Sequence, residues 1–204
     1  SDGKVCLKSL TFAEIEQLLD NIGINKKRAE DLTRWLYHDK LLVKALDDSE
    51  NNSASKKYRM GRKIISSLSQ FSTAHGGLQL SSTNISIDGT VKLVSQLTWT
   101  QQTKGKPNLG TNGSVETVII PMLQGPKMKK RYTVCVSSQV GCAMNCKFCN
   151  TGKMGLLTNL QACQIVEQVV IAKRYLRDTK DNIPITGLVF MGMGEPFDNY
   201  EAVM

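Results

Sequence analysis

Three cysteines within eight residues carry the strongest chemical signal in this sequence. Cys142, Cys146 and Cys149 follow the spacing Cys-x3-Cys-x2-Cys. Thiolates are the usual ligands of iron–sulfur clusters, and three of them leave one iron of a four-iron cluster without a protein ligand. A structural zinc site would need a fourth cysteine or histidine nearby, whereas both histidines, His38 and His75, are remote in sequence. The pattern therefore favours a cluster with one iron open to a substrate or cofactor.

A glycine-rich segment, MGMGEP at residues 191–196, follows the cysteines by one helix-like and one strand-like stretch. Glycines at the carboxyl end of a strand in an α/β protein permit a ligand to approach the backbone closely. In such a site Glu195 offers a carboxylate to a cofactor amine. Taken alone, the segment is also typical of an ordinary Gly-Pro turn.

The elements that must position these motifs have the pattern of an α/β unit. The apolar runs VETVIIP, YTVCVSS and GLVFMG are typical of strands, and residues 159–177 have the periodicity of a helix. Strand, helix and strand joined by a long crossover indicate a parallel arrangement. On this helix Cys163 has apolar neighbours at helical spacing, which predicts a packed side chain rather than a ligand.

The first part of the chain is predicted to be a small helical module. Thr11 and Glu14 have the form of a capping box before a helix, and residues 25–38 predict a second helix. A third helix is expected to begin in the basic stretch 56–63. Such a stretch is as typical of a solvated helix face as of a phosphate contact.

A β-hairpin is expected after the helical module, because apolar residues alternate on both sides of Asp88-Gly89. Residues 100–114 are rich in Gln, Thr, Lys, Asn and Gly and predict a polar, flexible insertion. The predicted domains are a helical module at 1–80, the hairpin and insertion at 81–114, and the α/β part at 115–204.

The charge balance favours a polyanionic partner. The net charge is +8, with 26 Lys and Arg against 18 Asp and Glu, and such an excess attracts nucleic acid through counterion release. A basic surface without any nucleic acid is the alternative. Six cysteines without an apolar leader are typical of a reducing compartment. Because no apolar run reaches the roughly 18 to 20 residues of a membrane span, we expect a cytoplasmic protein, with a plastid or another organelle as alternatives.

The cysteine spacing, with Phe148 directly before the last cysteine, resembles the radical S-adenosylmethionine (radical SAM) superfamily, whose enzymes use a 4Fe-4S cluster and SAM. The longer string VETVIIP...YTVCVSSQVGCAMNCKFCNTGKMG...LVFMGMGEPFDNY resembles the RlmN-type adenine-C2 RNA methyltransferases and their relatives that methylate adenine C8. This resemblance covers nearly the whole chain, and residues 115–200 carry most of it. It implies an α/β fold: the first part of a radical SAM partial (β/α)6 barrel, preceded by the hairpin and by a helical accessory domain of RNA-binding type.

The resemblance also implies roles for individual residues. Glu116 matches the family's proton acceptor, and Cys135 matches a cysteine that forms a transient disulfide with a methyl-carrying cysteine near the family's C-terminus. Without the resemblance, Glu116 would be a surface charge on a strand and Cys135 a small buried residue. The remaining matches are the cluster ligands Cys142, Cys146 and Cys149 and the SAM contacts Phe148, Gly194 and Glu195.

The implied reaction is methylation of adenine C2 in large-subunit rRNA and tRNA. One SAM molecule would methylate a mobile cysteine, and a second would give a 5'-deoxyadenosyl radical that activates this methyl group. Adenine C2 is not nucleophilic, so a radical route is chemically reasonable where polar methyl transfer is not. The resemblance further implies an electron donor such as a flavodoxin or ferredoxin system, and we expect a monomer.

The chain ends at Met204, after about two of the six strand-helix units that the resemblance implies, and no match to the methyl-carrying cysteine is found. We therefore expect a fragment that binds a cluster but does not methylate RNA unaided. Three alternatives stay open: adenine-C8 methylation, a non-catalytic RNA-binding iron–sulfur protein, and an activase of another enzyme. The basic N-terminal module and Glu116 favour RNA over the activase.

Overall fold

The chain folds into two compact units, residues 1–76 and 77–204, each with its own apolar core. The computed structural model describes residues 4–37, 46, 58, 60–98, 113–122, 130–179, 181 and 183–204. Residues 100–112 of the polar insertion predicted at 100–114 lie outside the described residues, as do the basic residues Lys56, Lys57 and Arg59, while Ser114 is already the first residue of a strand.

The first unit is a helical module around a small core. Its helices are α1 (Phe12–Asn21), α2 (Ala29–Leu36) and α4 (Arg62–Phe71). Trp35 is fully buried among them. The predicted capping box is confirmed, because the Glu14 N–H donates to Thr11 Oγ1 at 3.3 Å and the Thr11 N–H donates to Glu14 Oε2 at 2.7 Å. The short elements of this unit are β1 (Val5–Cys6), η1 (Leu7–Ser9), η2 (Lys26–Arg28) and β2 (Ser72–Thr73).

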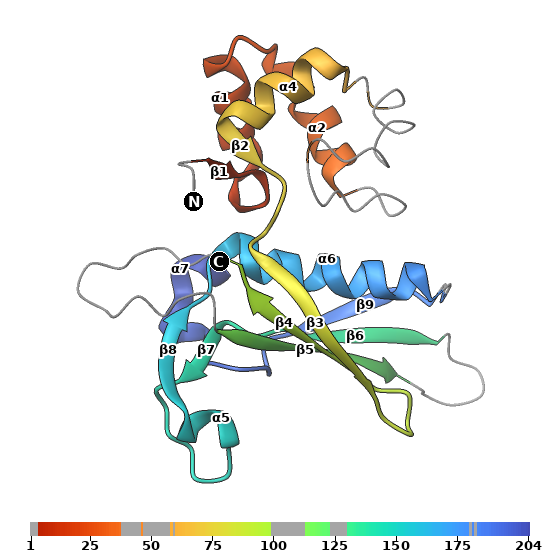
Figure 1. Ribbon diagram of the computed structural model, residues 1–204, viewed down its shortest axis with the longest axis vertical. Coiled ribbons are helices and arrows are strands. Elements are labelled where there is room, and N and C mark those ends of the chain that lie inside the picture. The colour runs from red at the N-terminus through yellow and green to blue at the C-terminus, as the bar shows by residue number, and fades with distance from the viewer. Residues whose placement is uncertain are drawn as a thin grey trace. The chain divides into compact units, whose positions relative to one another are not determined.

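The second unit is built on a five-stranded mixed sheet with the order β3-β4-β5-β6-β9 (Figure 1). Its strands are β3 (Leu78–Ile85), β4 (Val91–Leu97), β5 (Ser114–Met122), β6 (Arg131–Cys135) and β9 (Ile185–Val189). Neighbouring strands are antiparallel from β3 to β6, while β6 and β9 are parallel. The long helix α6 (Ala162–Asp178) lies in the connection between β6 and β9. The predicted parallel strand-helix-strand unit is therefore confirmed.

The predicted hairpin is confirmed as β3 and β4. Their pairing begins with Ile85 opposite Val91, on either side of the turn that contains Gly89. Its strand β4 continues into the sheet by pairing with β5. The hairpin thus belongs to the same compact unit as residues 115–204, because each strand of the sheet is hydrogen-bonded to the next.

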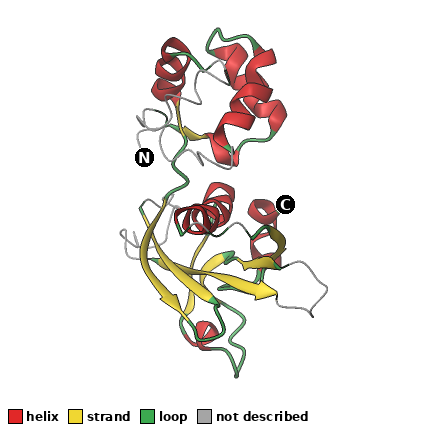
Figure 2. Ribbon diagram, turned by 90° about the vertical axis from the view of Figure 1, so that its right-hand side faces the viewer, coloured by secondary structure: helices red, strands yellow, loops and turns green. Residues whose placement is uncertain are grey.

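Side chains alternate between the two faces of the sheet, and α6 lies along one of them (Figures 1 and 2). Val115, Thr117 and Ile119 of β5 are fully buried, and Thr117 Oγ1 donates to Gln168 Oε1 of α6 at 3.1 Å. Glu116 and Val118 alternate with them and lie on the opposite face. Since Val118 pairs with Cys135, Glu116 and Cys135 share this second face.

A separate antiparallel ribbon carries the cysteine-rich loop. It consists of β7 (Gln139–Cys142) and β8 (Gly155–Asn159), and the connection between them contains the short helix α5 (Asn150–Lys153). The sequence pattern predicts a helix directly after the loop, whereas the structure places β8 before α6. The short stretch GLLTN becomes a strand because β7 supplies a pairing partner, and local periodicity does not show such a partner.

The chain after β9 continues through η5 (Pro196–Asn199) into α7 (Tyr200–Val203). Within the part of the chain that the structure describes, no helix has both the length and the apolar character needed to cross a membrane.

Candidate functional site

The three motif cysteines lie at one end of the β7–β8 ribbon. Cys142 is the last residue of β7 and is buried, Cys146 is exposed in the following loop, and Cys149 directly precedes α5 and is partly exposed. Asn145 has a φ of 48°, a left-handed conformation that asparagine adopts more readily than most residues. The Cys149 N–H donates to the Cys146 carbonyl at 3.0 Å. The loop is thus a tight turn that leaves the Cys146 side chain, and part of the Cys149 side chain, open to solvent.

Backbone amides are directed at two of the three sulfurs. The Met144 N–H donates to Cys142 Sγ at 3.5 Å, and the N–H groups of Gly152 and Thr151 contact Cys149 Sγ. Hydrogen bonds of this kind favour the thiolate form and tune an iron–sulfur cluster when one is bound. They lower the pKa of the Cys149 thiol below its ordinary value, with Gly152 as the main cause.

The donor set suits an iron–sulfur cluster in its chemistry. Among the residues that the structure describes, however, no three Cys, His, Asp or Glu side chains lie close enough together to hold a metal ion. A metal site is commonly completed as the metal binds, because deprotonated ligands held together without a metal repel one another. The three thiols and their amide donors therefore fit the cluster in the chemistry of the ligand set.

The cysteines should differ in reactivity when no cluster is bound. Thiolate, which forms above the pKa, is the form that reacts with iodoacetamide. Burial raises the pKa of the Cys135 thiol, while Cys149 has a lowered pKa and is more exposed. We expect Cys149 to be alkylated at a lower pH than Cys135, as read by mass spectrometry of peptides labelled between pH 6 and pH 10. Labelling of both cysteines with the same pH midpoint would contradict these environments.

The glycine-rich segment lies against the chain that links β6 to β7. Met193 is its anchor, since its N–H donates to Ser137 Oγ at 3.0 Å and its carbonyl accepts from the Ser138 N–H at 2.9 Å. The Glu195 N–H donates to Gln139 Oε1 at 2.8 Å. Residues 191–196 therefore form a rigid loop at the carboxyl ends of β6 and β9, where ligands bind in α/β folds.

Gly194 is required at its position in this loop. Its φ is 100°, and a Cβ there would lie 2.6 Å from Gln139 Cβ and 2.8 Å from the Gln139 nitrogen. Glu195 follows with its Oε1 accepting the Phe197 N–H at 3.1 Å. A carboxylate has two oxygens and about four lone-pair sites, so Glu195 retains capacity for a cofactor amine.

Cys135 lies at the end of β6, next to this loop. It is buried and pairs with Val118 on one side and Val189 on the other. The Met191 N–H contacts its sulfur and partly opposes the effect of burial on its pKa. The structure thus brings Cys135 together with the first residue of the glycine-rich segment.

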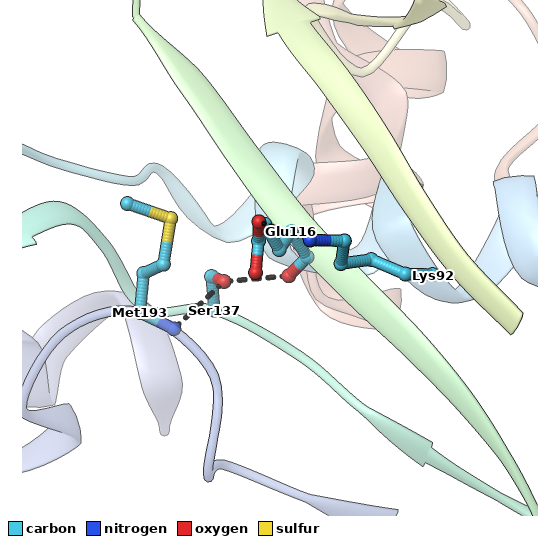
Figure 3. A network of polar contacts seen from close by, with 4 residues as sticks. All are labelled: Lys92, Glu116, Ser137 and Met193. Carbon is cyan, nitrogen blue, oxygen red and sulfur yellow. Dashed lines mark hydrogen bonds and ion pairs between the residues drawn. The ribbon is translucent and has the colours of Figure 1, made fainter. Parts of the chain in front are cut away.

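Glu116 is paired with a lysine from the hairpin (Figure 3). Lys92 Nζ of β4 lies 3.1 Å from Glu116 Oε1, and both side chains are a little over 40% exposed (43% and 45%). An ion pair this exposed contributes only about 0 to 1 kcal/mol to stability. Its effect is to orient the Glu116 carboxylate on the face of the sheet shared with Cys135.

Several polar residues that organise the site escape prediction from the sequence. Four of these side chains form hydrogen bonds with residues far along the chain: Lys92, Ser137, Gln139 and Asn199. Asn199 Nδ2 donates to the carbonyls of Ser138 and Leu160. Three of them, Ser137, Gln139 and Asn199, are buried polar side chains. The sequence offers a signal for two of these, because Ser137 and Gln139 belong to the polar run Ser-Ser-Gln inside apolar surroundings. Phe148, by contrast, is 93% exposed and presents its whole ring to solvent.

Proteins named as dual-specificity RNA methyltransferases are similar to the chain over its whole length. It is 33% identical over 204 residues to the dual-specificity RNA methyltransferase RlmN of Buchnera aphidicola subsp. Schizaphis graminum, covering 100% of this chain and 48% of that protein. It is 36% identical over 201 residues to the probable dual-specificity RNA methyltransferase RlmN of Phocaeicola vulgatus, covering 98% of this chain and 47% of the relative. No family model matches the chain.

A solved structure agrees with these relatives. The crystal structure of a radical SAM methyltransferase from Sphaerobacter thermophilus has a TM-score of 0.74 and 33% sequence identity, over 98% of this chain and 50% of that one. The chain spans about half the length of the curated relatives it matches. By sequence, this chain is therefore a homologue of the RlmN dual-specificity RNA methyltransferases, and its structure is similar to that of a radical SAM methyltransferase.

Proposed function

We propose that this chain is part of a radical SAM enzyme that methylates C2 of adenine in large-subunit rRNA and tRNA, acting in the cytoplasm as a monomer. The observation that carries the proposal is the similarity of the whole chain to RlmN proteins at 33% and 36% identity. The net charge of +8 suits an RNA substrate. A flavodoxin or ferredoxin system would deliver the electrons.

The proposed architecture is the beginning of a partial (β/α)6 barrel. The parallel pair β6 and β9, with α6 between them in the chain, would be its first strand-helix-strand unit. Because β9 is the last strand in the order of the sheet, a further parallel strand would add to its outer edge. The face that carries Glu116 and Cys135, opposite α6, would then line the interior.

The residues have distinct proposed roles. Cys142, Cys146 and Cys149 would hold a 4Fe-4S cluster, which when bound supplies the electron for reductive cleavage of SAM. Glu195, held by the Gln139 side chain, would bind the methionyl amine of SAM, and Gly194 would let it approach the backbone. The exposed ring of Phe148 would stack on the adenine of the cofactor.

The remaining two residues would act in the methylation reaction itself. Glu116, oriented by Lys92, would accept a proton from the adenine carbon. Cys135 would pair transiently with a methyl-carrying cysteine from a part of the protein beyond this chain. Burial keeps Cys135 protonated by raising its pKa, and it would therefore react mainly when the partner cysteine is brought to it.

A chimaera tests the function directly. Residues 1–204 would replace the matching half of the Phocaeicola vulgatus relative, and the cluster would be reconstituted without oxygen. The protein would then be incubated with SAM, a reductant, and unmodified rRNA and tRNA transcripts. We expect 2-methyladenosine in the digested RNA, identified by chromatography and mass spectrometry against 2- and 8-methyladenosine standards.

The unaltered relative, assayed in parallel, is the positive control. Unmodified adenines with the chimaera, beside methylated adenines with the relative, would contradict the proposal. An 8-methyladenosine product would replace C2 by C8 as the position of methylation.

A further inference from the structure

A single buried hydroxyl joins the strand that carries Glu116 to the glycine-rich segment (Figure 3). Ser137 Oγ donates to the Glu116 carbonyl at 2.7 Å and accepts from the Met193 N–H at 3.0 Å. Ser137 is fully buried. The partners lie 21 residues before it and 56 residues after it in the chain, so this contact spans three separate segments.

The position of Ser137 explains why a hydroxyl is needed there. Pairing between β5 and β6 ends at Val118 and Cys135, and both main-chain groups of Ser137 are bound by the Gln168 side chain of α6, each at 2.8 Å. The Glu116 carbonyl and the Met193 N–H therefore need another partner. Only a group that donates and accepts can join a carbonyl to an N–H, and a hydroxyl does both.

We infer that Ser137 is a positioning residue, which holds the glycine-rich segment in a fixed place relative to Glu116. This inference rests on the proposed function, in which Glu195 binds SAM and Glu116 accepts the substrate proton. Without the hydroxyl, the Met193 N–H loses its partner, and the segment is held less firmly, by the bonds that remain at the Met193 carbonyl and the Glu195 N–H. SAM would then bind a segment that must first be ordered, which weakens binding.

The adjacent residue provides a matched control. Ser138 is also buried, but its hydroxyl has no hydrogen-bond partner among the described residues. Its main chain keeps its bonds in a Ser138→Ala variant, because its N–H donates to the Met193 carbonyl and its own carbonyl accepts from Leu160 and Asn199. Ser137→Ala and Ser138→Ala thus remove the same atom from neighbouring buried sites. Only Ser137→Ala removes the hydrogen bonds to the Glu116 carbonyl and the Met193 N–H.

Two measurements on the full 204-residue chain test the inference. The first is the hydrogen-exchange rate of the Met193 amide by NMR, which should rise about tenfold or more in Ser137→Ala and stay near the original in Ser138→Ala. The second is the dissociation constant of SAM for the cluster-reconstituted chain, which should rise about tenfold in Ser137→Ala alone. Ser137→Thr, which keeps a hydroxyl, should restore both.

Circular dichroism first establishes that each variant is folded at the temperature used, so that the comparison does not report unfolding. Equal Met193 exchange rates in Ser137→Ala and Ser138→Ala would overturn the inference. So would equal SAM affinities in these two variants. If the unaltered reconstituted chain binds no SAM, the proposed function fails instead, and the exchange rates still decide whether Ser137 holds the segment.

Discussion

Replacing Cys146 by alanine will leave the chain unable to hold a four-iron cluster. We expect anaerobic reconstitution to give about four iron and four sulfide per unaltered chain, and less than about one iron per Cys146→Ala chain. The reason is that the loop supplies three thiols, and two thiolates do not secure a cluster that already lacks a fourth protein ligand. Iron and sulfide analysis after desalting provides the measurement.

Exposure makes Cys146 the most informative of the three ligands to replace. Its side chain contributes nothing to the core, and the unfolding temperature of the cluster-free chain should therefore be unchanged. Cys163→Ala is the control: Cys163 is fully buried on α6 as its helical spacing predicts, and that variant should keep its iron. Full iron content in Cys146→Ala, or one zinc and no iron in the unaltered chain, would refute the cluster assignment.

Replacing Gly194 by alanine will destabilise residues 77–204 by roughly 2 to 5 kcal/mol, the sum of backbone strain and overpacking. The strain arises because a φ of 100° is unfavourable for a residue with a Cβ. The overpacking arises because that Cβ would overlap the main chain and side chain of Gln139. The free energy of unfolding can be read from hydrogen exchange in increasing urea, on peptides from residues 77–204.

A second glycine separates the two causes. Gly89 also has a positive φ, 82°, but a Cβ there would meet only Pro121 Cγ at 3.8 Å, an ordinary contact. Gly89→Ala should therefore cost only the strain, about 1 to 2 kcal/mol. If Gly194→Ala cost no more than Gly89→Ala, the close approach of the glycine-rich segment to Gln139 would be disproved.

Much of the fold is predictable from the sequence where its causes are local. The capping box of Thr11 and Glu14, the hairpin around Gly89 and the helix α6 each depend on residues within a few positions of one another. The ribbon strand β8 and the union of the hairpin with the later strands were not predictable in this way. Both depend on pairing between distant segments, which no short window of sequence contains.

The candidate site likewise has a part that the sequence predicts and a part that depends on distant contacts. Cys142, Cys146 and Cys149 stand within eight residues, so their spacing alone predicts a ligand set. The sequence does not reveal that the loop amides of Gly152 and Thr151 favour the Cys149 thiolate, because this depends on how the turn folds. The sequence also does not reveal that the Met191 N–H contacts the Cys135 sulfur.

The thiolate motif and the glycine-rich segment predict the chemistry of this protein from the sequence, because their residue types and spacing depend on no other part of the chain. Which residues accompany these two motifs depends on the tertiary structure. Lys92 meets Glu116 across 24 residues and Ser137 meets Met193 across 56. Both contacts depend on strand register. One residue of slip in β5 would turn Glu116 to the α6 face and away from Lys92, and the Ser137–Met193 contact depends in the same way on the pairing of β6 with β9.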